Sequence, residues 1–197
     1  MLISADLDST INTQHFFRNV MRAFSRPCQA HSMRDGAAGQ ALPQAKDATL
    51  KELCNIFLDS SVSFYVHGDP ELAGAIREAT YAKTADIEAA DFVLLDGARD
   101  YALLDRVYPG SLVSPHKGAT VFAAVPQIDG AVKIEAEGPG INGRASCLVD
   151  ASIARCLRQV AAMDKEYPKG FELLFATPQG DLFAVPRHVR TYEEEEF

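Results

Sequence analysis

The chain has 197 residues, of which 47% are hydrophobic and 23% charged, a composition typical of one packed globular domain rather than a disordered or fibrous protein. Its formal net charge of −8 repels phosphate backbones and anionic lipid headgroups, which argues against nucleic-acid-binding and membrane-binding proteins. We therefore expect a single domain over residues 1–197, with no nucleic-acid or membrane partner.

Cysteine usage and the N-terminal sequence favour a cytoplasmic protein. The four cysteines are widely spaced, with no C-x-x-C pair and no nearby histidine at zinc-ligand spacing, so we expect reduced thiols and no structural metal. The first ten residues carry two acids and no basic cluster. No apolar run approaches the roughly 18 residues of a membrane span.

The first half of the chain alternates predicted helices with short predicted strands, judged from apolar spacing and from the positions of Gly, Pro and Asp. The expected elements, in order, are a helix (Thr10–Pro27), a loop or irregular hairpin (28–46), a helix (Asp47–Asp59), a strand (Val62–Val66), a short helix beginning at Asp69-Pro70, and a buried strand (Phe92–Leu95).

The second half is richer in predicted strands. The expected elements are a hairpin of Ala119–Val125 and Ala131–Ala136 around Asp129-Gly130, a helix (Asp150–Met163), and a closing hairpin of Phe171–Ala176 and Leu182–Val185. Strands separated by helices, followed by hairpins, predict an α/β domain with a mixed sheet.

Two acidic residues near the N-terminus offer one catalytic interpretation. The sequence Asp6-Leu7-Asp8-Ser9-Thr10 follows Leu2 and Ile3, and a strand ending in D-x-D-x-T begins the haloacid-dehalogenase-type phosphatases. In those enzymes the first Asp attacks phosphorus and the second is the general acid/base, with Mg²⁺ bridging carboxylate and phosphate. Asp96 and Asp100 would be the later metal-holding acids. A helix start with acids near its positive end explains the same residues equally well.

A glycine-rich segment offers a second interpretation. Residues 138–143, Gly-Pro-Gly-Ile-Asn-Gly, match the G-x-G-x-x-G pattern of dinucleotide-binding loops. The preceding segment alternates with charges instead of reading as a buried parallel strand, and Pro139 removes one amide donor, so dinucleotide binding is disfavoured. A glycine-rich turn in close contact with neighbouring backbone is favoured, and a phosphate-binding nest of another kind stays open.

Arginine and backbone amides are the residue types that would hold an anion. We single out Arg26, Arg187 and the amides around Gly138, Gly140 and Gly143 as candidate anion-binding residues. A solvated sheet end is the alternative interpretation for Arg187. No Ser/His/Asp or Cys/His arrangement stands at a recognisable spacing and no lysine is marked out as a Schiff-base former, so we assign no catalytic residue and expect no cofactor.

Ordered segments over about 170 residues carry a resemblance to a known family. The segments are Gln14–Arg18, Met21–Pro27, Ile56–Asp59, Ala90–Leu94, Gly110–Pro115, Gly118–Thr120, Gly138–Ile141, Tyr167–Leu173 and Ala184–Arg187. Together they resemble the PhnH family, a component of the bacterial carbon–phosphorus lyase system of phosphonate metabolism.

The resemblance implies a fold and a role. The fold would be a three-layer α/β/α domain similar in outline to pyridoxal-phosphate transferases but without their cofactor. The role would be that of a non-catalytic or assembly subunit which, with the G and I subunits, takes part in joining phosphonate to the ribose of MgATP with loss of adenine. Radical cleavage of the carbon–phosphorus bond would belong to the iron–sulfur J subunit. The resemblance also implies a homodimer when the chain is isolated.

The sequence departs from the family pattern at Cys28, where the Arg-Pro after the first helix is usually followed by Gly. A side chain there would strain a left-handed turn, so we expect the loop to run differently. Cys28 is then either a conformational substitute for Gly, which we favour, or a reactive thiol.

The net charge is unevenly distributed. Glu193–Glu196 supply half of the excess negative charge, and we expect residues 193–197 to be a mobile acidic tail. Residues 10–34 contain four arginines and no acid. This basic helical segment is where we would look first for an anionic ligand or an acidic partner surface.

Overall fold

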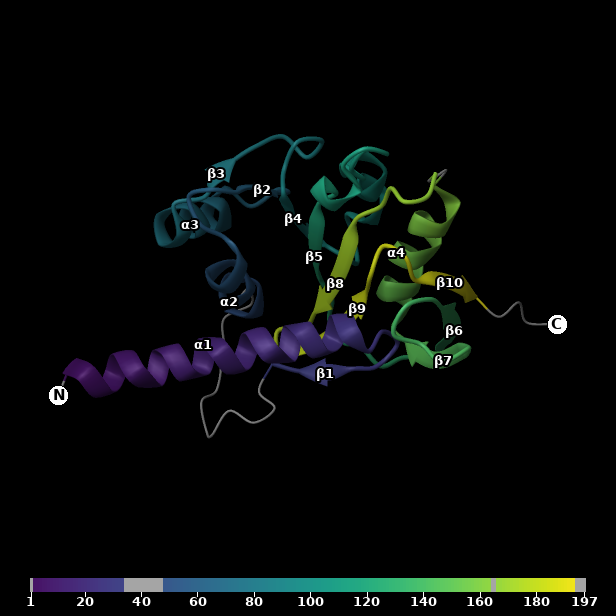
Figure 1. Cartoon of the computed structure of the whole chain (residues 1–197), viewed down its shortest axis with the longest axis horizontal. Coiled ribbons are helices and arrows are strands. Elements are labelled where there is room, and N and C mark those ends of the chain that lie inside the picture. The colour runs from purple at the N-terminus through teal and green to yellow at the C-terminus, as the bar shows by residue number, and fades with distance from the viewer. Residues whose placement is uncertain (1, 34–47, 164–165, 194–197) are drawn as a thin grey trace.

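A mixed sheet of seven strands forms the centre of the molecule in the computed structural model, which describes residues 2–33, 48–163 and 166–193 (Figure 1). The strand order is β1-β9-β8-β5-β4-β2-β3. The strands from β8 to β3 are parallel, whereas β9 is antiparallel to β8 and β1 is antiparallel to β9. Their bounds are β1 (His31–Ser32), β2 (Ser63–Val66), β3 (Lys83–Thr84), β4 (Phe92–Asp96), β5 (Thr120–Ala124), β8 (Glu172–Ala176) and β9 (Asp181–Val185).

Side chains of this sheet alternate between two hydrophobic cores. Leu94 and Phe122 are register partners on β4 and β5 and belong to one core, whereas their predecessors Val93 and Val121 belong to the other. The alternation follows from the two-residue period of a strand. Near-continuous apolar strands are therefore required, because the sheet is covered on both faces.

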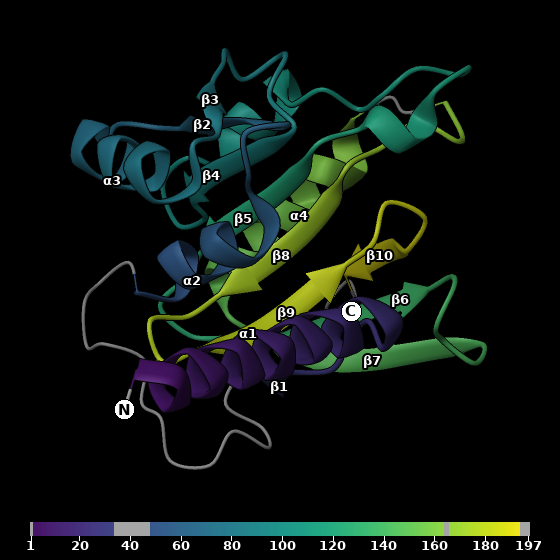
Figure 2. The same cartoon turned by 60° about the vertical axis from the view of Figure 1, so that its left-hand side comes forward.

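Three helices contribute to the core on the first face of the sheet: α1 (Leu2–Ser25), α2 (Ala48–Phe57) and α3 (Pro70–Thr80). Each buries apolar residues of its inward side, such as Val20, Leu53 and Ile76. Figures 1 and 2 show α1 as a long helix that runs beside β9 and β1.

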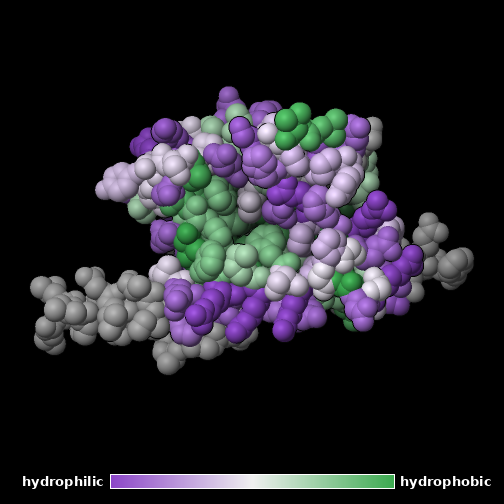
Figure 3. Space-filling model, in the orientation of Figure 1, coloured by the Kyte–Doolittle hydropathy of each residue, from purple (hydrophilic) through white to green (hydrophobic). Residues whose placement is uncertain are grey.

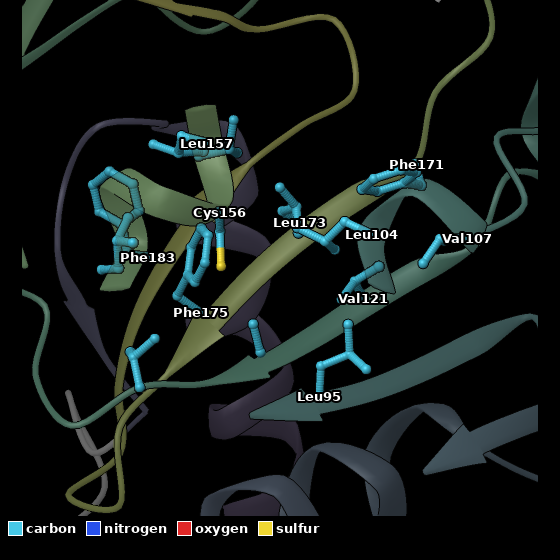
Figure 4. Close-up of a cluster of buried hydrophobic side chains, with 14 of the residues drawn as sticks. Leu95, Leu104, Val107, Val121, Cys156, Leu157, Phe171, Leu173, Phe175 and Phe183 are labelled. Carbon is cyan, nitrogen blue, oxygen red and sulfur yellow. The ribbon is translucent and has the colours of Figure 1, made fainter. Parts of the chain in front are cut away.

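A helix and a second sheet cover the other face. Helix α4 (Ala151–Ala162) and the 3₁₀ helix η1 (Tyr101–Arg106) pack over β4, β5, β8 and β9, and Figure 4 shows Cys156 and Leu157 of α4 beside Phe175. The second sheet has the order β10-β6-β7, with β6 (Val132–Glu137), β7 (Arg144–Val149) and β10 (Arg190–Glu193). A further 3₁₀ turn, η2, spans Pro115–Lys117. The predicted α/β fold with a mixed sheet is confirmed; its likeness to pyridoxal-phosphate transferases stays a prediction.

The predicted helix starts are confirmed at two aspartates. The Asp69 carboxylate accepts a hydrogen bond from the Leu72 amide at 2.8 Å at the start of α3, with Pro70 in the first turn. The Asp150 carboxylate accepts from the Ser152 amide at 2.8 Å at the start of α4. These are N-caps of the ordinary kind, in which a side-chain oxygen satisfies a free amide of the first turn.

The predicted hairpin around Asp129-Gly130 is wrong. Strand β5 lies in the large sheet and β6 in the small one, where β6 pairs with β7 and β10. Gly130 is required there by a close approach, because a Cβ on it would lie 2.4 Å from the Val149 carbonyl oxygen. The actual hairpin is β6–β7, closed by residues 138–143, and β7 was not predicted.

The observed bounds differ from the expected ones at the first helix, in the segment 28–46 and at the C-terminal segment. Helix α1 begins at Leu2, well before the expected Thr10. Within the expected loop 28–46, His31–Ser32 forms β1 and pairs with β9, and residues 34–46 lie outside the described residues. Glu193 closes β10 and is not part of a tail, and residues 194–197 also lie outside. No helix in the described part of the chain is long and apolar enough to cross a bilayer.

Candidate functional site

The glycine loop of residues 138–143 connects β6 to β7 and packs against the end of α1. Gly140 has φ +87°, and a Cβ on it would lie 2.8 Å from both Pro27 Cδ and the Ser25 carbonyl oxygen. Gly138 has φ +141° and faces the His188 carbonyl oxygen, 2.7 Å from its would-be Cβ. The loop is therefore the glycine-rich turn in close backbone contact that the sequence favours, and its place between two antiparallel strands contradicts a dinucleotide-binding loop.

Arg26 lies on this same corner of the molecule. Its amide continues the helical pattern by donating to the Arg22 carbonyl at 2.9 Å, and its side chain is exposed. The next residue, Pro27, is the one that contacts Gly140. The structure thus brings together two of the predicted anion-site elements, Arg26 and the glycine loop; anion binding itself stays a prediction.

Arg187 is engaged in an internal ion pair. Its Nε donates to Glu172 Oε1 at 2.6 Å, its amide donates to Glu172 Oε2 at 3.0 Å, and its Nη1 donates to the Pro115 carbonyl. The two side chains are only 16% and 22% exposed. Arg187 thereby ties the end of β9 to the first residue of β8 and to η2, and an anion would have to compete with the Glu172 carboxylate for it.

Cys28 adopts the left-handed conformation with φ +64°, so the expectation that the loop would run differently is wrong. Its thiol is buried in the core beside Cys147 of β7. A hydrogen bond with Cys147, together with burial, raises the pKa of the Cys28 thiol well above its ordinary value, whereas the same hydrogen bond lowers the pKa of Cys147. Of the two thiols, Cys147 is therefore the one that loses its proton at the lower pH.

The predicted phosphatase geometry is absent. Asp6 and Asp8 lie within α1 instead of following a strand. Asp96, at the end of β4, accepts a hydrogen bond from the Ala98 amide at 3.0 Å, and Asp100 accepts from the Asp96 amide at 3.1 Å. Both line a crevice of about 250 Å³ at the carboxyl ends of β2, β4 and β5. Among the described residues no group of His, Cys, Asp and Glu is arranged to hold a metal ion.

An apolar groove opens on the first face of the sheet, between α1 and α2. It has a volume of about 350 Å³, and Figure 3 shows it as a hydrophobic hollow bordered by a hydrophilic band along α1. Its lining residues are Phe24, Phe57, Phe92, Thr120, Phe122, Glu172 and Pro186.

The aromatic rings of the groove form a contiguous surface. The Phe57 centroid lies 6.4 Å from that of Phe92 and 6.0 Å from that of Phe122, and Phe17 extends the cluster at 5.8 Å from Phe57. Local sequence patterns do not reveal this groove, because its walls come from residues 24, 57, 92 and 122. Two neighbouring phenylalanines of α1 differ in burial: Phe16 is buried in the core and Phe17 is 43% exposed.

Comparison with known proteins identifies the family. Residues 5–192 match the sequence model of a family described as "Bacterial phosphonate metabolism protein (PhnH)". The chain belongs to the PhnH family. The resemblance read from the ordered sequence segments is thereby confirmed. Two of those segments, Met21–Pro27 and Gly138–Ile141, meet in the contact between Pro27 and Gly140.

One relative of this PhnH-family chain comes from Stutzerimonas stutzeri. It is described as a putative C-P lyase subunit protein, HtxG, and is 28% identical over 176 residues, covering 88% of this chain and 83% of its own length. The similarity extends over nearly the whole of both proteins, so it concerns the entire fold and not one segment.

Proposed function

We propose that this PhnH-family chain is a non-catalytic or assembly subunit of a carbon–phosphorus lyase complex. The observation that carries the proposal is the family match over residues 5–192, and the resemblance to a relative named as a C-P lyase subunit supports it. With the G and I subunits, the chain would take part in joining phosphonate to the ribose of MgATP with loss of adenine, in the cytoplasm. The J subunit would act later, on the carbon–phosphorus bond.

The surface of the chain supports a role in assembly. Phe17 and Met21 of α1 are 43% and 46% exposed beside the apolar groove, and exposed apolar surface of this extent is typical of protein interfaces. Arg187, one of the candidate anion-binding residues, is already paired with the Glu172 carboxylate. A homodimer of the isolated chain is part of the proposal.

Affinity purification tests this function. The chain is co-expressed with the G, I and J subunits of the same system, with the tag on the I subunit. We expect the chain to be retained at a constant ratio to the tagged subunit through gel filtration. Its loss under conditions that keep the other three subunits together would contradict the proposal. The same expression without the tagged subunit is the control for non-specific retention.

A further inference from the structure

Among the residues that the structure describes, none covers the apolar groove, although its walls are aromatic. The rings of Phe57, Phe92 and Phe122 pack against one another at tilted angles, and Phe24 of α1 and Pro186 also line the groove. Phe24, Phe57 and Phe92 are partly exposed, whereas Phe122 is buried, so a partner would remove apolar surface mainly of the first three rings from water. A groove of about 350 Å³ accommodates several apolar side chains.

Helix α1 supplies an apolar ridge along this groove. Phe17, Met21 and Phe24 stand at positions i, i+4 and i+7, which places them on one side of the helix. Phe17 and Met21 are about half exposed, whereas Val20 and Ala23 of the neighbouring side are fully buried in the core. A second helix laid along α1 would bury this ridge by the same i, i+4, i+7 pattern, which is how amphipathic helices dock into grooves.

A row of arginines follows the ridge. Arg18, Arg22 and Arg26 recur every four residues and are exposed. Arg22 donates to the Asn19 side chain at 3.1 Å, and within the described part of the chain none of the three forms an ion pair with an acid. The carboxylate that lines the groove, Glu172, is already bound by Arg187. The rim therefore carries positive charge that the described residues do not balance, and a negatively charged neighbour would be attracted to it.

We propose that the groove bounded by α1 and α2 is the docking site for an acidic amphipathic helix of another subunit of the carbon–phosphorus lyase complex. Apolar residues of that helix fill the hollow over Phe57 and Phe122, and its acidic residues pair with Arg18 and Arg22. This inference rests on the proposed function, because it takes the partner from the same complex.

Photo-crosslinking identifies the occupant without disturbing the fold. A benzophenone analogue of phenylalanine replaces Phe17 in the full chain, which is co-expressed with the G, I and J subunits and irradiated. We expect a crosslink to a helical segment of another subunit that carries apolar residues every three to four positions and acidic residues beside them. Crosslinks only to a second copy of this chain, or to its own residues 194–197, would overturn the proposal.

Variants that reverse the charge or remove the apolar side chains of α1 measure how much the groove contributes to retention of the chain in the complex. Arg18→Glu with Arg22→Glu, and separately Phe17→Ser with Met21→Ser, should each weaken retention by the tagged I subunit by at least about tenfold. The matched controls are Arg77→Glu on α3 and Leu148→Ser on β7, which are exposed and do not line the groove, and these should leave retention unchanged. Thermal unfolding should be the same for the arginine variants and the controls, whose side chains are exposed, and slightly earlier for Phe17→Ser with Met21→Ser, which loses the contact of Phe17 with Phe57.

The two proposals fail differently. If the wild-type chain is retained and the groove variants are retained equally well, the docking site is wrong and the subunit role stands. If the wild-type chain is not retained, the subunit role fails and the docking site fails with it.

Discussion

Gly140 and Gly143 both have a positive φ but different surroundings. Both have a positive φ, +87° and +75°, which an L side chain adopts only at a cost. A Cβ at Gly140 would meet Ser25 and Pro27 at 2.8 Å, whereas nothing lies within 4 Å of a Cβ at Gly143. Comparing the two positions therefore separates two contributions to the free energy of unfolding: the positive φ by itself, and the contact between the glycine loop and α1.

Alanine substitution at these two glycines should give unequal losses of stability. Gly143→Ala should lower the free energy of unfolding by about 1 kcal/mol, because only the left-handed backbone is strained. Gly140→Ala should cost at least about 2 kcal/mol more, because the methyl group must also displace the end of α1. Urea unfolding of both variants measures the difference. Equal losses would mean that the loop does not pack on α1.

The thiol pair of Cys28 and Cys147 predicts selective reactivity. The hydrogen bond from Cys28 lowers the pKa of Cys147, so Cys147 should be alkylated by iodoacetamide at pH values below the ordinary thiol pKa. Cys28, Cys54 and Cys156 should all react after Cys147, since each is buried and has a raised pKa, about 12 for Cys54 and Cys156.

Removing the Cys28 thiol should raise the pKa of Cys147 and move its alkylation to higher pH. In Cys28→Ala the Cys147 thiolate loses its hydrogen bond, its pKa rises, and its alkylation at pH 7.5 slows. The measurement is the pH dependence of the alkylation rate, with modified peptides identified by mass spectrometry. A rate at Cys147 that is the same in wild type and variant would show that the two thiols do not interact.

At the scale of elements, the ion pair of Arg187 and Glu172 holds the end of β9 against the start of β8. Glu172→Gln should lower the free energy of unfolding by about 1 to 2 kcal/mol, because a charged hydrogen bond shielded from water is lost. Glu135→Gln is the matched control. Its partner Arg144 lies 3.4 Å away, and that arginine is 65% exposed, so the loss should be below about 0.5 kcal/mol. Similar losses in the two variants would assign Arg187 no structural role.

The stabilisation that Asp150 provides as the N-cap of α4 should depend on pH. Burial opposes ionisation of Asp150, but hydrogen bonds from Ser152 outweigh it and lower the pKa of the carboxyl. Asp150→Ala should therefore destabilise the protein by about 1 kcal/mol at pH 7. Because the folded-state pKa lies below the unfolded one, the difference from wild type should persist above about pH 4 and shrink as the pH falls through the lower, folded-state value. Unfolding at several pH values measures it, and a difference that stays constant into strong acid would contradict the cap.

Elements with strong local signals could be predicted from the sequence, and those defined by distant contacts could not. The two capped helices and the β8–β9 hairpin carry their signals within a few residues. Strand β7 begins directly after the glycine loop and contains Ala, Ser and Cys, which have weak strand propensity. Gly130 has the sequence signature of a hairpin turn, but its role is close contact with Val149, which no local pattern shows.

At the scale of the whole molecule, the candidate surfaces are assembled from segments far apart in the chain. The glycine loop meets α1 across more than a hundred residues, and the groove combines Phe24 with Phe92 and Phe122. The sequence identified Arg26 and the glycines as one candidate set, which the fold brings together. It did not reveal that Arg187 is bound by Glu172, because that pairing depends on the antiparallel register of β8 and β9.

The role of the chain in phosphonate activation is tested most directly by the release of adenine from MgATP. The G, I and J subunits are assayed with methylphosphonate, with and without this chain, and adenine is quantified by chromatography. Adenine should be released by the complex that contains the chain, fall to background when the chain is omitted, and be absent with the chain by itself. Unchanged release without the chain, or release by the chain by itself, would contradict a non-catalytic subunit that the complex requires.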